Sequence, residues 1–196
     1  LRGQSCLSLT EIAPSRKQIV SSRSFGTYVY KLQDLEQAVT SYMSKAALKL
    51  RTDGSIAAAV TVYIKTNRYA QSEDQYAQSA TIPLDTPTDD TLVLVKAALK
   101  GLHQIYRSGF AYQKAGVVLL DLSDKGERQL SLFQSAESVN KSEKLMKLLD
   151  ATNNTMGRGT LYIAAESQNH SWKMKSEYLT PEYTTSWKGL AVVKAK

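Results

Sequence analysis

The segment SIAAAVTVYIKTN, residues 55–67, decides the fold of this chain. Its β-branched and apolar side chains follow one another almost without interruption, which is typical of a buried strand. Residues 34–54 before it repeat apolar side chains at three- and four-residue steps and predict an amphipathic helix. Further upstream, KQIVSSRSF (residues 17–25) predicts a first strand, interrupted by Gly26. The first part of the chain is therefore predicted to be a β-α-β unit.

A second unit of the same kind follows. QYAQSATIPL predicts a weaker strand that ends near Pro83, and residues 91–109 predict a second amphipathic helix. Asp89 and Asp90 stand directly before this helix, so we interpret them as capping charges rather than as a catalytic pair. Residues 112–126 predict the last strand. Right-handed crossovers of a β-α-β-β-α-β order give an α+β, ferredoxin-like domain, in which two helices cover one face of a four-stranded antiparallel sheet.

Composition changes after residue 126, and the chain is divided accordingly. We expect a lead-in at 1–16, a folded domain at 17–126, a linker at 127–140 and a C-terminal extension at 141–196. Within the extension, SEKLMKLLDATNN predicts a short helix, and GRGTLYIAAES suggests a strand introduced by two glycines. The extension is thus expected to be a small α/β unit.

Four aromatic residues gather in the tail of the extension. We interpret them as a small core, with anchors for a protein partner as the alternative. They are Trp172, Tyr178, Tyr183 and Trp187.

The overall composition favours binding over catalysis. The net charge of +7 favours polyanionic partners. The single cysteine, Cys6, fits a reducing cytoplasm, and no apolar run approaches the ~18 residues that would cross a membrane. Two distant histidines and one cysteine give no metal-ligand spacing, and no phosphate loop or nucleophile elbow is present. We therefore expect no chemistry and no cofactor in this chain.

Three short basic segments are predicted to lie in corresponding parts of the sheet. They are SSRSFG (21–26), IKTNR (64–68) and RSGFAYQK (107–114). Hydroxyls, backbone N–H groups and cationic side chains together can contact phosphate oxygens. Each segment alone is more typical of solvated surface, but three on one sheet suggest a groove that follows a nucleic-acid backbone.

Several stretches, in order and spacing, resemble the little-finger domain and C-terminal extension of the UmuC-type Y-family DNA polymerases. They are KQIVSSRSFG, IKTN, SATIPLDTPTDDT, YQKAGVVLLDL, GRGTLYIA and YLTPEYTTSW. The resemblance covers essentially the whole chain. It implies a domain that grips primer-template DNA through backbone contacts during translesion synthesis in the SOS response to DNA damage.

The resemblance also carries expectations for individual residues. The palm domain of such polymerases holds the catalytic carboxylates and their Mg²⁺, and this chain, which begins with Leu1 rather than Met, is expected to be a fragment without it. Residues 1–16 would then be the end of the thumb and a tether. The DNA-contacting role carries over onto Ser22, Arg23, Ser24, Lys65, Thr66 and Lys114.

The polar segment after the last strand contains QLSLF, which resembles the peptide by which bacterial polymerases bind the β sliding clamp. Its residues are Gln129, Leu130, Ser131, Leu132 and Phe133. Leu132 and Phe133 would enter an apolar pocket, while the Gln129 amide makes directional hydrogen bonds. The alternative is that these apolar side chains cover an edge of the chain's own domain.

The resemblance further implies the processed UmuD dimer and the RecA filament as partners of the C-terminal region.

Two alternatives for the function of the chain remain from the residues alone. A free-standing module of the RRM kind would need exposed aromatic residues on its central strands, where only Tyr63 is available. An acylphosphatase-like enzyme could hold phosphate with Arg23 but lacks a partner that would orient water.

Overall fold

The computed structural model describes most of the predicted domain and part of the extension. The described residues are 15–70, 74–127, 136–167, 172–174, 178–179, 183, 187–190 and 192. The predicted clamp-binding peptide, residues 129–133, and most of the expected lead-in lie outside them.

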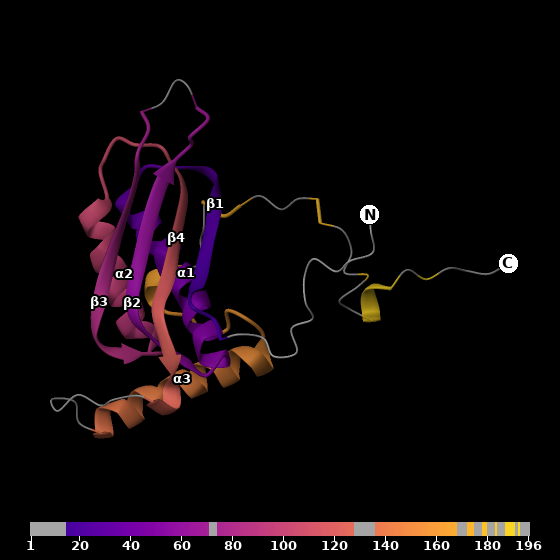
Figure 1. The fold of residues 1–196 in the computed structure, drawn as a ribbon. Coiled ribbons are helices and arrows are strands. Elements are labelled where there is room, and N and C mark those ends of the chain that lie inside the picture. The colour runs from indigo at the N-terminus through magenta and orange to yellow at the C-terminus, as the bar shows by residue number, and fades with distance from the viewer. Residues whose placement is uncertain are drawn as a thin grey trace, which may run out of the picture.

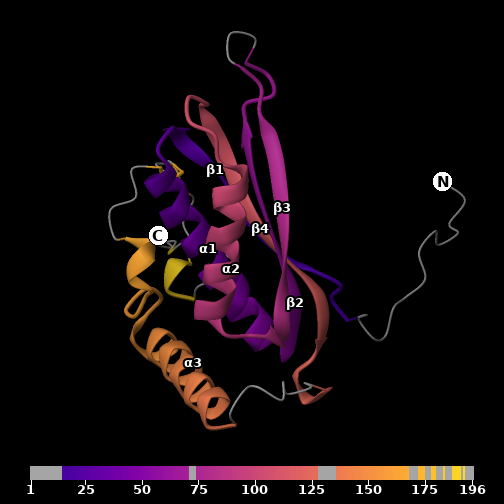
Figure 2. The ribbon, with the colours of Figure 1, turned by 90° about the vertical axis from the view of Figure 1, so that its left-hand side faces the viewer.

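A four-stranded antiparallel sheet with the order β1-β4-β2-β3 forms the centre of the domain. The elements are β1 (Ile19–Val29), α1 (Leu32–Thr52), β2 (Ser55–Thr66), β3 (Ala77–Thr88), α2 (Thr91–Ile105), β4 (Tyr112–Asp124) and α3 (Ala136–Met156). Both β-α-β units are split, because β4 lies between β1 and β2, and β2 lies between β3 and β4. Figures 1 and 2 show α1 and α2 on one face of the sheet and the other face uncovered. The predicted domain architecture is confirmed.

The core lies between the two helices and the sheet. Apolar side chains at helical spacing on α1 and α2 meet alternate side chains of the strands, as the two periodicities require. The largest fully buried side chains include Tyr42, Leu50, Ile64, Leu102 and Tyr112. In the described ranges, no helix combines the length and apolar character needed to cross a bilayer.

The boundaries of β3 and α2 depend on two local features. The strand β3 continues past Pro83 to Thr88, so the expected end at this proline is wrong. Because β3 is an edge strand, the missing N–H of Pro83 removes no essential ladder bond. Asp90 caps α2 by accepting a hydrogen bond from the Leu92 N–H at 2.8 Å, whereas Asp89 is buried and forms an ion pair with Lys125 at 2.7 Å.

The helix α3 begins at Ala136, inside the segment expected to be a linker. Its side chains meet the domain at three charged or polar positions. Asp150 pairs with Arg51, Glu143 with Lys125, and the Ser142 hydroxyl bonds to Asp90. Figures 1 and 2 accordingly place α3 at the lower end of the domain. The extension is thus attached to the domain by side-chain contacts.

The strand expected at GRGTLYIAAES is not formed. Gly157 and Gly159 take positive φ values of 105° and 87°, and the chain turns back alongside α3. The Asn153 side chain donates to the Leu161 carbonyl at 2.8 Å and accepts from the Leu161 N–H at 3.0 Å. These are the backbone groups that pairing with another strand would have used. Among the described residues, the extension therefore contains helix and short 3-10 turns instead of an α/β unit.

The four tail aromatics do not form a small core of their own. Trp172 is 5% exposed and packs edge-on against Phe25 and Tyr42, so it belongs to the main core. Tyr178, Tyr183 and Trp187 are 98%, 50% and 91% exposed. The expectation of a local core is wrong because Trp172 finds its apolar partners in β1 and α1.

Candidate nucleic-acid interface

Two lysines and a serine form a row across the open face of the sheet. Ser24 of β1 pairs with Lys114 of β4, and Lys114 pairs with Lys65 of β2. Directly paired residues of antiparallel strands point to the same face. The three basic segments predicted from the sequence are therefore brought together here. Ammonium groups directly opposite each other repel, so an anion between Lys65 and Lys114 would stabilise this part of the sheet.

The next row on the same face contains hydroxyl groups, and its position on β4 has no side chain. Ser22 pairs with Gly116, and Gly116 pairs with Tyr63. The ring of Tyr63 extends over Gly116, because a Cβ built on this glycine would lie 2.5 Å from Cζ and Oη of Tyr63 and from Cβ of Ser22. The absence of a side chain at Gly116 thus allows the phenol end of Tyr63 to lie over this position beside Ser22.

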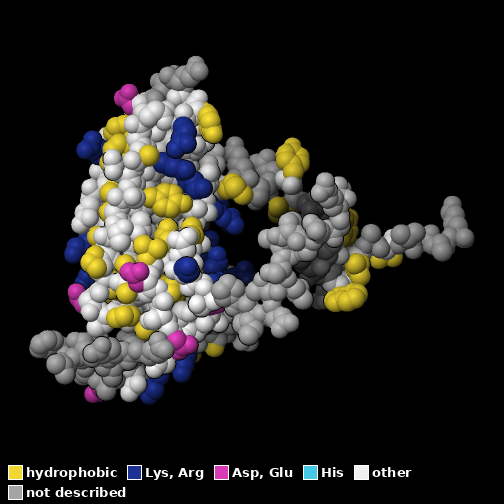
Figure 3. Space-filling view, in the orientation of Figure 1, with side chains coloured by type: hydrophobic (Ala, Val, Ile, Leu, Met, Phe, Trp, Pro, Cys, Tyr) yellow, Lys and Arg dark blue, Asp and Glu magenta, His cyan; other side chains and the backbone are white. Residues whose placement is uncertain are grey.

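Figure 3 looks onto the open face. Lys and Arg side chains gather over its upper part, and further dark blue side chains continue along the β1 edge. The lysine row lies where β2 ends and β4 begins. The charge of this face is therefore concentrated at one end of the sheet.

Arg23 lies on the other face from the lysine row. It pairs with Ala115, a fully buried residue of the core, so its side chain leaves the sheet on the helix-covered side. Because β1 is an edge strand, Arg23 remains exposed there and lines a cavity next to α1. The structure therefore separates Arg23 from the other basic residues predicted to contact DNA.

Thr66 has a structural position. Its side chain is buried, and its hydroxyl accepts a hydrogen bond from the Tyr76 N–H at 2.9 Å. The Thr66 N–H in turn donates to the Tyr76 carbonyl at 2.9 Å. These bonds close the connection between β2 and β3. Of the six residues predicted to contact DNA, four share the open face: Ser22, Ser24, Lys65 and Lys114.

Sequence reasoning missed two groups of residues. The first is Gly116, which shapes the open face together with Tyr63; Tyr63 was considered only as a base-stacking ring, and the alternation of β4 would have placed Gly116 beside it. The cations Lys45, Lys49 and Arg158 line the cavity beside Arg23. In the sequence, only the i, i+4 spacing of Lys45 and Lys49 could have indicated a shared basic surface, since it puts both lysines on one side of α1.

Among the described residues, no group of three His, Cys, Asp or Glu side chains could hold a metal ion. His103 contacts Glu36 at 2.6 Å on the helix-covered side, away from the lysine row.

Comparisons with known proteins give matches over almost the whole chain. Residues 16–132 match the model of the impB/mucB/samB family C-terminal domain, and residues 143–193 match a domain of unknown function, DUF4113. The chain is 43% identical to Protein UmuC of Salmonella typhimurium over 194 residues, and 41% identical to Protein MucB of Escherichia coli over 196 residues. These matches cover 99% and 100% of the chain but 46% of each relative.

Among solved structures, the chain is similar to one described as "Complex of beta-clamp processivity factor and little finger domain of PolIV". The identity is 18% and the TM-score 0.38, with 60% of this chain and 99% of that chain covered. The chain spans just under half the length of the relatives UmuC and MucB. On the strength of the match over residues 16–132, the chain belongs to the impB/mucB/samB family and contains its C-terminal domain.

Proposed function

We propose that this chain is the DNA-gripping and clamp-tethering region of an error-prone translesion DNA polymerase of the SOS response. The observation that carries the proposal is the row formed by Ser24, Lys114 and Lys65 on the uncovered sheet face. Membership of the impB/mucB/samB family, with 43% identity to UmuC and 41% identity to MucB, supports the polymerase context. The polymerisation reaction and its Mg²⁺ would belong to a palm domain, and this chain would supply affinity for primer-template DNA.

The chemistry of the open face favours contact with the DNA backbone over contact with bases. Ammonium and hydroxyl groups bind phosphate oxygens without distinguishing sequence. Ser22 and Ser24 are small, so a duplex can approach β1 closely. A module that stacked single bases would need several aromatic rings, whereas on the two central strands Tyr112 is buried and Tyr63 alone lies on the open face.

Fluorescence anisotropy with labelled primer-template duplex tests the DNA proposal. Lys65→Gln combined with Lys114→Gln should weaken binding equally for unrelated sequences. It should also lower the slope of log affinity against log salt by about 2, because roughly one counterion is released per phosphate contact. The matched control is Lys96→Gln with Lys100→Gln, which removes the same charge from exposed positions of α2. Equal losses in the two double variants would refute the open-face site.

The peptide QLSLF at residues 129–133 is proposed to bind the β sliding clamp. It follows the last strand of the domain and precedes α3, so a partner could take it up without disturbing the sheet. Burying Leu132 and Phe133 offers roughly 1.5–3 kcal/mol each before ordering costs, which suits a micromolar tether.

Surface plasmon resonance with purified clamp tests the tether. Leu132→Ala with Phe133→Ala should abolish binding while circular dichroism stays unchanged. The control is Leu145→Ala with Leu148→Ala, which removes exposed apolar side chains from α3. Unchanged clamp binding by the first variant would mean that the peptide is not the tether.

The processed UmuD dimer and the RecA filament are proposed partners of residues 141–196. The exposed rings of Tyr178 and Trp187 supply the kind of side chain that anchors protein interfaces. If Trp187 enters such an interface, adding the UmuD dimer should shift its fluorescence to shorter wavelength. The shift should vanish in Trp187→Phe, because Trp172 is already buried. A shift that persists in this variant would exclude Trp187 as an anchor.

A further inference from the structure

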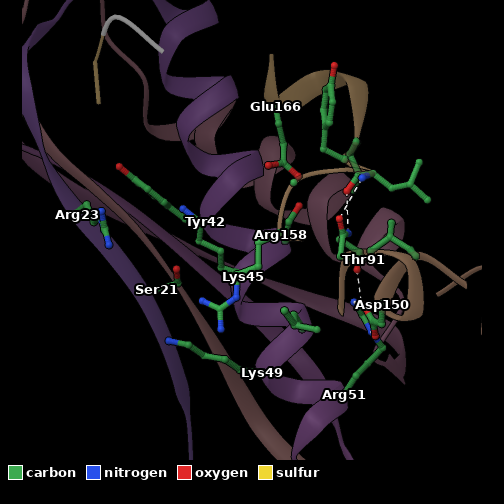
Figure 4. Close-up of a pocket in the computed structure, with 18 of the residues that line it drawn as sticks. Ser21, Arg23, Tyr42, Lys45, Lys49, Arg51, Thr91, Asp150, Arg158 and Glu166 are labelled. Atoms are coloured by element: carbon green, nitrogen blue, oxygen red, sulfur yellow. Dashed lines mark hydrogen bonds and ion pairs between the residues drawn. The ribbon is translucent and has the colours of Figure 1, made fainter. Parts of the chain in front are cut away.

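A basic cavity lies on the helix side of the β1 edge, across this strand from the lysine row. Its volume is about 540 Å³, within the usual range for ligand sites of ~300–1,000 Å³. Its walls come from β1, α1, α3 and the turn at 157–166. Figure 4 shows this arrangement, with Arg23 on β1 and Lys45 and Lys49 on α1. The cavity is therefore built jointly by the domain and the C-terminal extension.

Cations outnumber acids in the described lining of this cavity. Arg51 is neutralised by a two-point contact with Asp150, at 2.6 and 2.8 Å. Four other cations have no ion-pair partner among the described residues: Arg23, Lys45, Lys49 and Arg158. Glu166 is the remaining acidic side chain of the described lining. The cavity thus carries an excess of positive charge that an anion would neutralise.

The crowding of cations is visible at Lys45. Partial burial lowers the pKa of its ammonium group, and the neighbouring charges of Arg23 and Lys173 lower it further, against the opposing effect of Glu166. Lys49 stands one helical turn away and, in Figure 4, extends from α1 toward β1. Like charges held this close are unfavourable without a counter-charge, so the geometry suits a ligand with more than one anionic group.

The walls between the cations are apolar or aromatic. They include Leu48, Leu149, Leu161, Ile163 and the ring of Tyr162, which is 41% exposed. A cationic groove combined with aromatic surface is the usual means of holding single-stranded nucleic acid, whose phosphates and bases need both. A cavity of this volume admits nucleotides but not a double helix.

Continuity with the lysine row favours nucleic acid over an acidic peptide. Side chains of β1 alternate between the faces, so Ser22 and Ser24 point to the lysine row and Arg23 points to the cavity. Figure 3 shows dark blue side chains along this edge. A strand leaving a duplex on the open face would meet the cavity by passing around β1.

We propose that this cavity binds single-stranded nucleic acid, with phosphates held by Arg23, Lys45, Lys49 and Arg158. The extension then contributes directly to nucleic-acid binding through Arg158 and Tyr162. This inference deepens the proposed DNA binding and rests on it for the continuity of the two surfaces. The lysine row would hold duplex, and the cavity would hold the unpaired strand.

Anisotropy with labelled oligothymidylate and, separately, blunt duplex tests the proposal on the 196-residue chain. Lys45→Gln with Lys49→Gln should weaken single-strand binding by at least about tenfold. It should reduce the salt slope by about 1.4, the value for two contacts with a single strand. Duplex binding should be unchanged. Lys96→Gln with Lys100→Gln is the matched control, because it has the same spacing and charge on α2.

Each other outcome overturns a defined part of the argument. If the unchanged chain binds duplex but not the single strand, the cavity site is refuted and the proposed function stands. If it binds neither, both are refuted. Equal effects of the two double variants would make the cavity cations ordinary solvated charges. If a glutamate peptide of matched charge binds as tightly as the oligonucleotide and is equally sensitive to the variants, the site is one for acidic peptides.

Discussion

The phenol end of Tyr63 lies over Gly116, close to where the first atom of any side chain at this position would stand. A Cβ on Gly116 would be 2.5 Å from Cζ and Oη of Tyr63. The two residues are direct partners on the central strands β2 and β4. Ser22 of β1 approaches the same point at 2.5 Å. Glycine is needed here for close approach of neighbouring side chains, and three strands depend on it.

Gly116→Ala should therefore destabilise the domain and alter its open face. The added methyl group must displace Tyr63 or separate β1 from β4, and overpacking of this kind costs about 1–3 kcal/mol. Urea unfolding followed by circular dichroism measures the loss. Adding Tyr63→Ser should recover part of it and leave the part due to Ser22. An unchanged unfolding midpoint in Gly116→Ala would show that Tyr63 is free to move away.

The sheet and its two covering helices could be predicted from periodicity alone. The almost continuous apolar run at 55–67 fixed a central strand, and the helical spacing on both sides of it fixed the crossovers. These patterns can be recognised in a single sequence because the polarity of each side chain indicates whether its position is buried. The four residues of the open face were named through the resemblance to the UmuC-type polymerases, within basic segments that stand at corresponding points of the strands.

Other features depended on contacts that a local pattern does not contain. SSRS in β1 is polar at every position, so alternation could not show that Arg23 points away from Ser22 and Ser24. The strand expected after Gly157 was lost to one side chain, Asn153, which bonds both backbone groups of Leu161. The basic cavity joins β1, α1 and the extension across more than a hundred residues of sequence.

Thr40→Val should stabilise the domain. Thr40 is fully buried on α1, and its hydroxyl has no hydrogen-bond partner among the described residues. A buried hydroxyl without a partner costs about 1–3 kcal/mol, while valine has nearly the same shape. We expect the free energy of unfolding to rise by roughly 1 kcal/mol once the slightly weaker helix preference of valine is subtracted. Calorimetry gives the sign, and Thr40→Ala, which leaves a gap, should lose stability. A loss for Val as well would show that the hydroxyl is bonded in solution.

Tyr42→Phe should change the response of the domain to alkaline pH. Burial raises the pKa of Tyr42 from 10.0 to about 12, with Arg23 opposing this and Tyr63 adding to it. Between these values the folded chain keeps a proton that the unfolded chain has lost, so stability falls as pH rises. Phenylalanine removes this contribution. Urea midpoints measured below pH 10 and again between pH 10 and about 12 should decline less steeply in the variant. Parallel declines would mean that Tyr42 ionises as freely in the fold as in the unfolded chain.

Asp150→Ala should release α3 from the domain and open the basic cavity. Arg51 holds Asp150 through two nitrogen–oxygen contacts, and its remaining nitrogen donates to the Asp89 carbonyl and the Thr91 hydroxyl. One side chain therefore joins α1, α2 and α3. Without the carboxylate, amide hydrogen exchange in α3 should accelerate, while exchange in β2 and β4 stays slow.

The same variant separates two explanations of single-strand binding. Removing Asp150 makes the chain more positive, so attraction by net charge alone predicts tighter binding of oligothymidylate. Binding that depends on the geometry of the cavity should instead become weaker, because Leu149, Arg158 and Tyr162 depend on the docking of α3 for their positions. Anisotropy at low salt, with Glu137→Ala as a control of equal charge change on an exposed turn of α3, decides between them. Tighter binding in Asp150→Ala would count against the cavity, since affinity would then follow charge and not the geometry of its walls.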